Sequence, residues 1–377
     1  MSEIEIHGHC APGFRALRDE FAANFTEDRE IGARFALAVE GQIVADLWAG
    51  YADRGKSRPF DARTLTPVFS TTKAVAALMI ARLVDQGRLA YDQPVAQIWP
   101  AFAQAGKGAI TVEQLLSHQA GLCGLTEPMD PALWFDWDAI CDRLAAMAPL
   151  WPPGSASGYH PVTFGHLVGE IHRRVDGRTI GTALREDIAV PFGLDVWIGL
   201  PDSEHARCAD MRRPPHLPDL GPLTAPRQAA FMTKWASPAG ADIGQWRRAE
   251  FPSANGHATA PALARLMAVL ACDGSLDGHA VLSPGMAAKA AARRIVGDDL
   301  VLPYRVAWGA GFMRNEGLGL YGPGAETVGH SGWGGSCAFA DPQRRLSGAY
   351  VMNKQSALLI DDPRPARLIA AAYSALG

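Results

Sequence analysis

Hydrophobic and polar positions divide the chain into a sheet-like beginning, a helical middle and a sheet-like end. Apolar residues recur at helical spacing between Phe14 and Phe25, which predicts an opening amphipathic helix. Residues 34–50 then form two apolar runs on either side of Glu40-Gly41. This pattern predicts two strands joined by a tight turn.

A helix of unusual character is predicted from Ser70 to Gln86, with Gly87 as its stop signal. It is apolar on nearly every face, so it should lie in the centre of the molecule. From residue 92 to 258 the pattern favours helices and irregular loops. The segment 201–238 is rich in proline, which is typical of functional or mobile loops.

The end of the chain returns to the pattern of a sheet. The predicted elements are a helix over 260–271, strands over 307–313, 337–340 and 346–353, and a helix over 365–376. We therefore predict an α/β domain built from both ends of the chain, residues 1–90 and 260–377. A mostly helical domain, residues 91–259, interrupts it, and the active site should lie between the two.

The composition is that of an ordinary globular protein and argues against two kinds of partner. Of the 377 residues, 48% are hydrophobic, and the net charge of −4 offers no basic field to nucleic acid. No apolar run is long enough to span a membrane, and the N-terminus lacks the pattern of a signal peptide. The six scattered cysteines form no C-x-x-C pair, so we expect reduced thiols and a cytoplasmic location.

The strongest candidates for chemistry are Ser70 and Lys73, which form the only Ser-x-x-Lys in the chain. If Ser70 caps the helix, the lysine amine lies on the same face and within reach of the hydroxyl. The helix dipole and burial both disfavour an ammonium there, so Lys73 could accept the proton of the serine. The alternative is a capping serine followed by a solvated lysine.

Two later segments carry further candidates. Tyr159 follows a run of turn residues, so we expect it on a loop, where it could relay a proton beside a lysine or simply pack. Residues 328–336 are rich in glycine and precede an apolar strand. Their backbone could approach a ligand closely and supply an N–H to an oxyanion hole, or form an ordinary turn.

Together these motifs resemble the serine β-lactamase-like superfamily, and the similarity is greatest to class C β-lactamases, D,D-peptidases and family VIII carboxylesterases. The motifs occur in the order Ser70-x-x-Lys73, Tyr159, His330-Ser331-Gly332. The segments 115–122 (L-L-S-H-Q-A-G-L) and 252–260 also look like parts of that superfamily. The resemblance covers residues 35–373. It implies a β-lactamase-like α/β fold, with an antiparallel sheet flanked by helices and a mostly helical second domain inserted.

The resemblance also implies a role for each motif. Ser70 would be the nucleophile, Lys73 its general base, and Tyr159 would pass the proton to the leaving group. The triplet 330–332 would line the substrate site in place of a Lys-Thr-Gly triplet.

The same resemblance implies an oxyanion hole formed by the backbone N–H groups of Ser70 and Trp333. An alternative register takes residues 333–335 as the triplet and moves the second donor to Ser336. The distance of His330 from the turn at residues 341–342 favours the first register.

Two positions depart from the pattern of β-lactamases. Their Tyr-x-Asn reads Tyr159-His160-Pro161, so the Asn amide is missing, and His330 replaces the lysine that would bind a β-lactam carboxylate. An ester needs only an activated serine, an oxyanion hole and an apolar pocket. We therefore predict a serine carboxylesterase that hydrolyses short-chain acyl esters through an acyl-enzyme on Ser70, without a cofactor.

Several alternatives stay open, namely a β-lactamase or D,D-peptidase, an acyltransferase, and a non-catalytic binding protein on the same fold. The expected partner is a small-molecule ester rather than nucleic acid or a membrane. The natural ester, its chain length and the oligomeric state, a homo-oligomer included, are not fixed. Candidates for lining an acyl pocket, or for packing in the core, are Trp134, Phe135, Trp137, Trp235, Trp308 and Trp333.

Two unrelated catalytic classes fit the residues poorly. An α/β-hydrolase would use Ser331 as its nucleophile, but its elbow needs glycine where Trp333 stands, and no histidine follows His330. A metal enzyme would draw on His7, His9, His160, His166 and His172. The last three are six residues apart, which does not place them on one helical face, and no H-E-x-x-H motif appears.

Overall fold

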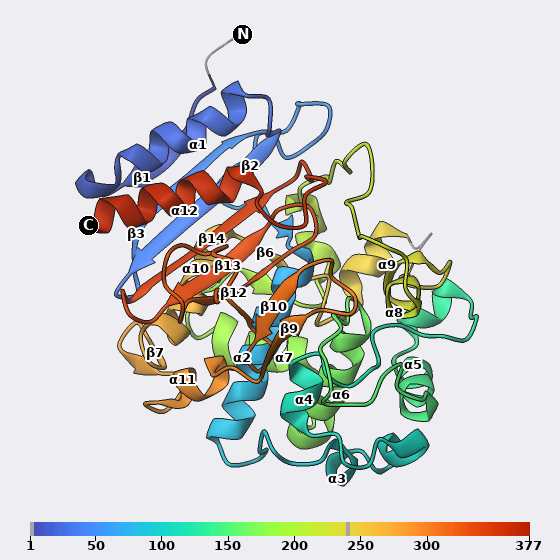
Figure 1. The fold of residues 1–377 in the computed structure, drawn as a ribbon. Helices are drawn as coiled ribbons and strands as arrows, with labels where there is room; N and C mark the ends of the chain where they lie inside the picture. Colours follow the sequence, from blue (N-terminus) through green and yellow to red (C-terminus); the bar gives the residue numbers. More distant parts are fainter. Residues whose placement is uncertain (1–3, 239–241) are drawn as a thin grey trace.

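The computed structural model describes residues 4–238 and 242–377. Its centre is a nine-stranded antiparallel sheet built from both ends of the chain, in the order β1-β3-β2-β14-β13-β12-β11-β10-β9 (Figure 1). The strands are β1 (His7–Cys10), β2 (Gly32–Val39), β3 (Gln42–Gly50), β9 (Ile295–Asp298), β10 (Arg305–Trp308), β11 (Met313–Arg314), β12 (Val328–Ser331), β13 (Cys337–Asp341) and β14 (Leu346–Met352). The expected α/β fold with a central antiparallel sheet is confirmed.

The predicted hairpin near the N-terminus is confirmed. β2 and β3 pair on either side of Glu40 and Gly41, whose φ angles of 52° and 79° are both positive. Two positive φ angles are what a two-residue hairpin turn requires to match the twist of its strands. β2 also pairs with β14, so the first and last strands of the predicted pattern lie side by side at the centre of the sheet.

The C-terminal part of the sheet differs from the prediction. The single strand expected over 307–313 is two paired strands, β10 and β11, because Gly311 has a φ of 86° and turns the chain between them. β1 and β9 were not predicted. Each has only four residues and lies at an edge of the sheet, so neither leaves a clear alternating pattern.

Helices cover both faces of the sheet. α1 (Ala16–Thr26) and α12 (Pro363–Leu376) contact each other on one face, and α10 (Ala260–Ala271) contacts β2, β13 and β14 on the other (Figure 1). Successive residues of β2 divide between these layers, since Phe35 belongs to the core with α1 and α12 and Ala36 to the core with α10. All three helices were predicted from the sequence.

The apolar helix of the sequence is α2 (Thr72–Asp85), and 12 of its 14 residues are buried, as expected. It contacts α6 (Thr163–Asp176), α7 (Ile180–Leu184), α11 (Met286–Ala291) and β12. The predicted start was wrong in one respect. Ser70 makes no capping hydrogen bond, because it lies in a 3-10 turn that precedes the helix.

Residues 91–259 contain mainly helices and loops, as predicted. The shorter helices there are α3 (Val95–Ile98), α4 (Val112–Leu116), α5 (Trp137–Ala146), α8 (Ala225–Arg227) and α9 (Ile243–Arg248). A small sheet joins β4 (Thr66–Pro67) and β5 (Val196–Trp197) to β6 (His257–Ala258), and β7 (Ser275–Leu276) pairs with β8 (His279–Ala280). The division into two domains stays a prediction.

Two further features of the chain follow from the structure. Among the described residues, no helix has both the length and the apolar character that crossing a membrane requires. All six cysteines are free, and five of them are buried.

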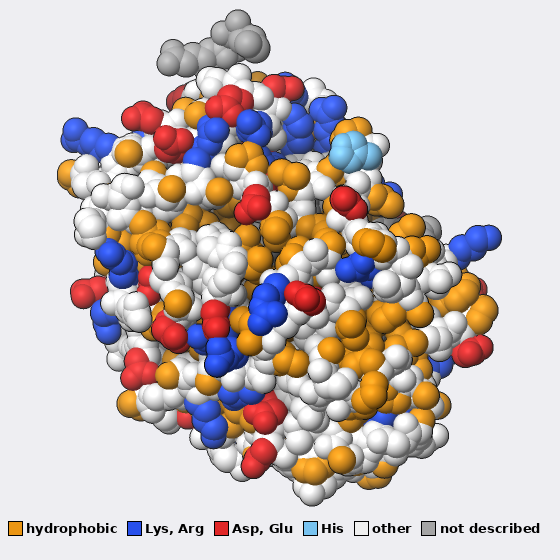
Figure 2. Space-filling model, in the orientation of Figure 1, with side chains coloured by type: hydrophobic (Ala, Val, Ile, Leu, Met, Phe, Trp, Pro, Cys, Tyr) orange, Lys and Arg blue, Asp and Glu red, His pale blue; other side chains and the backbone are white. Residues whose placement is uncertain are grey.

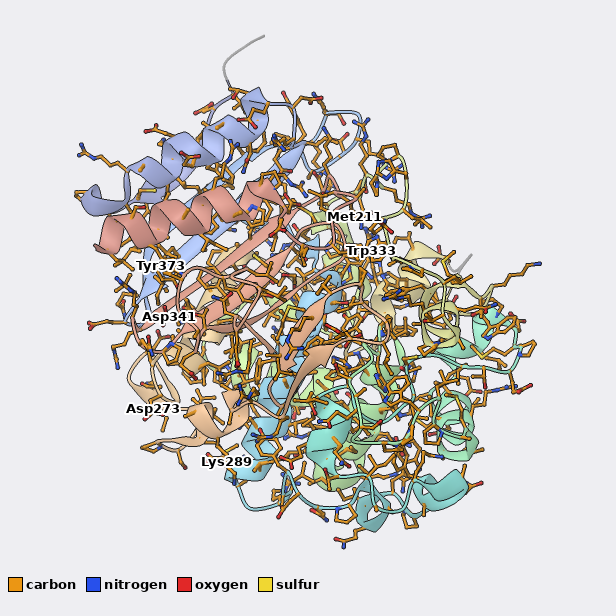
Figure 3. All side chains as sticks on the ribbon, in the orientation of Figure 1. Met211, Asp273, Lys289, Trp333, Asp341 and Tyr373 are labelled. Carbon is orange, nitrogen blue, oxygen red and sulfur yellow. The ribbon has the colours of Figure 1, made fainter. Side chains whose placement is uncertain are left out.

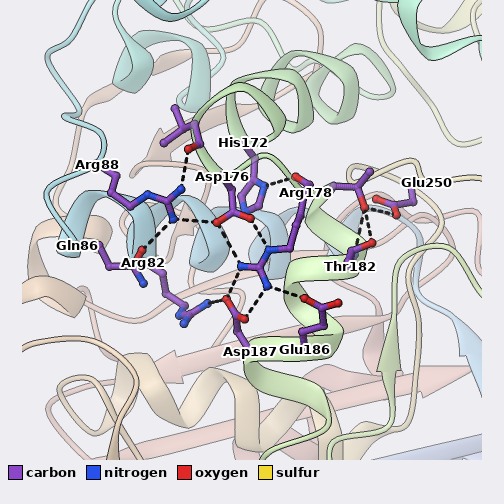
Figure 4. Close-up of polar contacts among 12 residues, drawn as sticks. Arg82, Gln86, Arg88, His172, Asp176, Arg178, Thr182, Glu186, Asp187 and Glu250 are labelled. Carbon is purple, nitrogen blue, oxygen red and sulfur yellow. Dashed lines mark hydrogen bonds and ion pairs between the residues drawn. The ribbon is translucent and has the colours of Figure 1, made fainter.

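A network of ion pairs ties the far end of α2 to α6 and to the turn after α7 (Figure 4). The Arg178 guanidinium lies 2.6 Å from Asp176 at the end of α6 and 2.9 Å from Asp187. Arg82 of α2 also binds Asp187, at 2.8 Å, and Arg88 binds Asp176 at 2.9 Å. Hydrogen bonds from Arg178 lower the pKa of both aspartates.

We predict that Arg178→Ala lowers the free energy of unfolding by about 1–2 kcal/mol at pH 7, because the nearly buried carboxylate of Asp176 loses a partner. Because the folded state lowers the pKa of these carboxyl groups, their ion pairs stabilise the fold fully above about pH 4, and this stabilisation is lost as the pH falls further. The difference between the variant and the native protein should therefore shrink below about pH 4. Chemical denaturation measures it, with exposed Arg143→Ala as the control.

Candidate active site

Ser70 lies in the 3-10 turn Phe69–Thr71, immediately before α2. Phe69 has a φ of 47°, a left-handed conformation that costs a non-glycine residue about 1–3 kcal/mol. The turn is held from outside, because the Val68 N–H donates to Gly256 O at 2.8 Å and Ser336 Oγ donates to Val68 O at 2.8 Å. Such strain is typical of functional sites.

Lys73 is completely buried in the first turn of α2. Its Nζ lies 2.8 Å from Pro161 O, 2.9 Å from Ser253 O and 3.2 Å from Ser70 Oγ. No described carboxylate forms an ion pair with it, and burial lowers the pKa of Lys73 well below its usual range. The alternative of a solvated lysine is therefore wrong.

Burial, rather than the number of contacts, favours the neutral form of the Lys73 amine. A neutral amine has two N–H donors and one lone pair. When the amine is neutral, the carbonyls of Pro161 and Ser253 accept its two N–H groups and its lone pair is left for the hydroxyl of Ser70; when it is charged, all three oxygens accept from it. An ammonium would hold three protons and could not accept that of the serine. The neutral form is the one in which Lys73 could act as a base.

Ser253 is a site residue that sequence reasoning missed. The segment 252–260 was recognised only as similar to a superfamily segment. Asn255 within it accepts a hydrogen bond from Phe251 N–H at 2.9 Å and donates to Trp246 O at 2.8 Å, which folds the chain into a turn. The turn presents Ser253 O to Lys73, a backbone contact that no side-chain pattern reports.

Tyr159 lies on a loop, as predicted, and is nearly buried. Its ring centroid is 4.7 Å from Lys73 Nζ, and its hydroxyl forms a hydrogen bond with Ser70. Burial raises the pKa of Tyr159 above its usual range despite that hydrogen bond, so the phenol stays protonated. The three residues Ser70, Lys73 and Tyr159, distant in sequence, therefore form one cluster.

Asp299 positions the Tyr159 loop and was not predicted from the sequence. Its buried carboxylate accepts hydrogen bonds from Tyr159 N–H at 2.8 Å, Ser157 Oγ at 2.9 Å and Leu302 N–H at 2.9 Å. The Trp308 indole, stacked on the Tyr159 ring at 5.9 Å, also donates to it, at 3.4 Å. A lone aspartate between the predicted helix 260–271 and the predicted strand 307–313 gives no signal of this role.

The segment 115–122 packs against the Tyr159 loop and binds its next residue, His160, by hydrogen bonds. The His118 Nδ1 accepts from His160 N–H at 3.2 Å, and the His160 Nε2 accepts from Leu122 N–H at 3.0 Å. Burial lowers the pKa of both histidines, that of His160 to about 3. These neutral rings are structural. Among the described residues, no cluster of His, Cys, Asp and Glu could hold a metal ion.

The predicted triplet lies at the end of β12, beside Ser70. Burial lowers the pKa of His330 to about 3, so the ring is neutral, and its Nδ1 faces Ser331 O at 2.8 Å. The hydroxyl of Ser331 lies 2.9 Å from that of Tyr321. At Gly332 any Cβ would overlap the carbonyl of Val68, so only glycine lets β12 approach the turn that carries the serine.

The amide N–H groups of Ser70 and Trp333 donate to no described residue. Trp333 lies in a turn closed by Gly332 N–H donating to Ser336 O at 2.7 Å, and Arg364 Nη2 donates to Gly334 O at 2.8 Å. Trp333 lines the cavity next to Ser70, whereas Ser336 is fully buried and does not. This geometry favours Trp333 over Ser336 as the second donor.

A cavity of about 1230 Å³ opens beside Ser70. Of the six aromatic candidates only Trp333 lines it, near Met211 (Figure 3). The other five lie in the core or pack against it, which was the alternative left open for each; Trp134, for example, donates its indole N–H to Trp235 O. The aromatic residues that do line it are Phe69, Tyr159, Phe231, Trp246, Tyr304 and Trp333.

Comparison with known proteins places this arrangement in a family. The sequence profile of the Beta-lactamase family matches residues 17–372. The chain belongs to the Beta-lactamase family. Its relatives include the "Esterase/beta-lactamase LipL" of Mycobacterium tuberculosis, which is 34% identical over 93% of this chain and 83% of that protein.

Two solved structures of the family are similar over nearly the whole chain. A penicillin-binding protein homolog from Caulobacter crescentus is 64% identical, with a TM-score of 0.97 over 98% of this chain and all of the other. A family VIII carboxylesterase is 43% identical, with a TM-score of 0.93 over 99% of this chain and all of the other. The predicted superfamily is confirmed, and the protein is a serine hydrolase of β-lactamase fold with esterases among its relatives.

We predict that Asp299→Asn destabilises the protein by about 1–3 kcal/mol, because the new NH₂ group would face the Ser157 hydroxyl and the Trp308 indole N–H instead of accepting from them. Chemical denaturation measures the loss, and near-UV circular dichroism reports on the Trp308 environment. The matched control is its exposed neighbour, Asp298→Asn. Equal stability of the two variants would contradict the role given to Asp299.

Proposed function

We propose that the protein is a serine carboxylesterase that hydrolyses short-chain acyl esters through an acyl-enzyme on Ser70. The observation that carries this proposal is the contact of 3.2 Å between Ser70 Oγ and the buried amine of Lys73. When that amine is neutral, two carbonyls occupy its N–H groups and leave its lone pair for the serine proton. This is the arrangement that activates a hydroxyl as a nucleophile.

In the proposed first step, Ser70 Oγ attacks the ester carbonyl carbon while its proton moves to Lys73. The carbonyl oxygen becomes an oxyanion and accepts hydrogen bonds from the free N–H groups of Ser70 and Trp333. The intermediate then collapses. The bond from the acyl carbon to the alcohol oxygen breaks, and that oxygen takes up a proton.

Tyr159 suits the transfer of that proton. It contacts both Ser70 and Lys73, and its raised pKa keeps it protonated. It can give its proton to the departing alcohol and recover one from Lys73, so that no tyrosinate persists. In the second step, water attacks the acyl carbon and gives a proton to Tyr159, which passes its own proton to Lys73. The bond between the acyl carbon and Ser70 Oγ then breaks, Ser70 Oγ takes the proton from Lys73, and the carboxylic acid leaves.

Two features favour an ester over a β-lactam. The neutral ring of His330 gives no fixed positive charge for a β-lactam carboxylate. Pro161, at the position of the missing Asn, uses its carbonyl to hold Lys73 and has no side-chain amide. The names of two similar proteins, the LipL esterase/beta-lactamase and the family VIII carboxylesterase, agree with esterase activity.

We predict that the native protein hydrolyses p-nitrophenyl acetate and butyrate faster than the octanoate, and a chromogenic cephalosporin only slowly. Ser70→Ala should lower kcat for the esters by at least about a thousandfold, because the nucleophile is gone. Initial rates on purified proteins measure both, with exposed Ser374→Ala as the control. A cephalosporin as the best substrate would indicate a β-lactamase, and full activity of Ser70→Ala would refute the assignment.

We predict that kcat/KM for p-nitrophenyl acetate falls as the pH falls through the lowered pKa of Lys73, because the amine is a base only when neutral. Lys73→Arg keeps the positive charge, so its rate should drop by about a hundredfold or more and not recover at high pH. The pH–rate profiles of both proteins test this. His330 is neutral above about pH 4, so it does not cause the fall in kcat/KM at low pH, and His330→Gln should show the same fall in its pH–rate profile.

A further inference from the structure

The mouth of the cavity carries large apolar side chains that are exposed to water. Four of them line it, Leu217 (66% exposed), Met232 (50%), Ile243 (59%) and Leu358 (49%). Among the described residues, only Val190 and Leu223 are other large apolar side chains with comparable exposure. Single exposed apolar residues are normal on proteins, but a group of them around one opening marks a binding surface.

These four side chains come from separate parts of the chain. Leu217 belongs to the proline-rich segment, Met232 ends the π turn Gln228–Met232, Ile243 begins α9, and Leu358 lies between β14 and α12. In Figure 2 apolar side chains are open to view in the region where Figure 3 labels Met211 and Trp333. Four segments thus contribute apolar groups to one rim.

The walls behind this rim are also apolar. They include Met211, Leu220, Phe231, Trp246 and Leu302. The volume of about 1230 Å³ exceeds the roughly 300–1,000 Å³ of a typical site for a drug-sized molecule. A short acyl group on Ser70 fills only a small part of it, so most of the apolar wall is left for the other half of the ester.

We propose that Leu217, Met232, Ile243 and Leu358 form an alcohol subsite that binds a large apolar alcohol moiety of the ester. This inference rests on the proposed function, since it takes the acyl group to be short and bound to Ser70. Each CH₂ group of the alcohol that is fully buried against this wall should raise the binding constant by just under fourfold. Where the wall leaves the CH₂ group half exposed, the rise should be about twofold.

The charged groups that line the cavity, three arginines and the exposed Asp210, define the rival occupant. Arg54 donates hydrogen bonds to Met211 O, and Arg247 donates one to His205 O, so both bind the protein itself. Arg213 lines the cavity, is exposed and forms no ion pair with a described residue. An alcohol moiety that ends in a carboxylate could bind there, and the experiment includes such an ester.

The test measures kcat/KM in a pH-stat for the acetate esters of ethanol, butanol, octanol and 4-hydroxybutanoate. We expect kcat/KM to rise about twofold for each CH₂ group added from the ethyl to the butyl ester, and to rise further for the octyl ester. Leu217→Ser and Leu358→Ser should each lower the ratio of the octyl to the ethyl ester by about threefold. The control is Val190→Ser, which removes a side chain of similar exposure (62%) that does not line the cavity and should keep the native ratio.

Several outcomes would overturn the alcohol subsite. These are an equal rate for all alkyl esters, the same ratio in the rim variants as in Val190→Ser, and a preference for the carboxylated ester. A shift to monomers in the rim variants, measured by sedimentation and with the ratio unchanged, would make the rim a contact between subunits. Ser70→Ala separates the two proposals. If it abolishes hydrolysis of every ester while the native series is flat, the esterase stands and the subsite fails; if it stays active, the proposed function fails.

Discussion

The rest of the site depends on a buried amine, that of Lys73, to which no described residue supplies a counter-ion. An isolated ammonium at the position of Lys73 would carry a desolvation penalty of several kcal/mol, so the surroundings favour the neutral amine. Three chain segments meet around it: the turn with Ser70, the loop with Pro161 and the turn with Ser253. The fold thus places both the proposed base and the buried surroundings that favour its neutral form.

The supporting structure works mainly through the backbone. Carbonyl groups hold Lys73, the N–H groups of Ser70 and Trp333 donate to no described residue, and Asp299 holds Tyr159 by its N–H. Backbone groups of packed segments are already fixed before a substrate arrives, which is what electrostatic catalysis requires. Gly332 completes the arrangement, because any side chain there would push β12 away from the serine turn.

The proposed chemistry and the proposed substrate recognition belong to different parts of the molecule. The cluster of Ser70, Lys73 and Tyr159 lies at the junction of α2, the sheet and the Tyr159 loop, all of them largely buried. The wall of the cavity comes largely from the proline-rich segment and from short helical turns, where side chains remain exposed. Loops tolerate changes that a packed core does not, so relatives with the same cluster can differ in the esters they accept.

The sequence by itself determined the family, the central apolar helix, the hairpin of β2 and β3, and the order of the motifs that contain Ser70, Tyr159 and His330. Each depends on local spacing or on residue types that a single segment displays. Short edge strands such as β1 were missed, since four residues leave too little pattern. The prediction that Ser70 caps the helix was wrong, because its hydroxyl contacts Lys73 instead of the N–H groups of the helix.

Only the tertiary structure decided which groups meet. The choice of Ser253 O and Pro161 O as partners of Lys73 depends on backbone contacts between segments 88 and 180 residues away from it. The sequence left both a pocket and a core position open for the six aromatic candidates, because an aromatic residue looks the same in either, and the structure places five of them in or against the core. Asp299 and the exposed rim likewise depend on contacts between distant segments. Local patterns determine the elements, whereas contacts over long sequence separations determine the site.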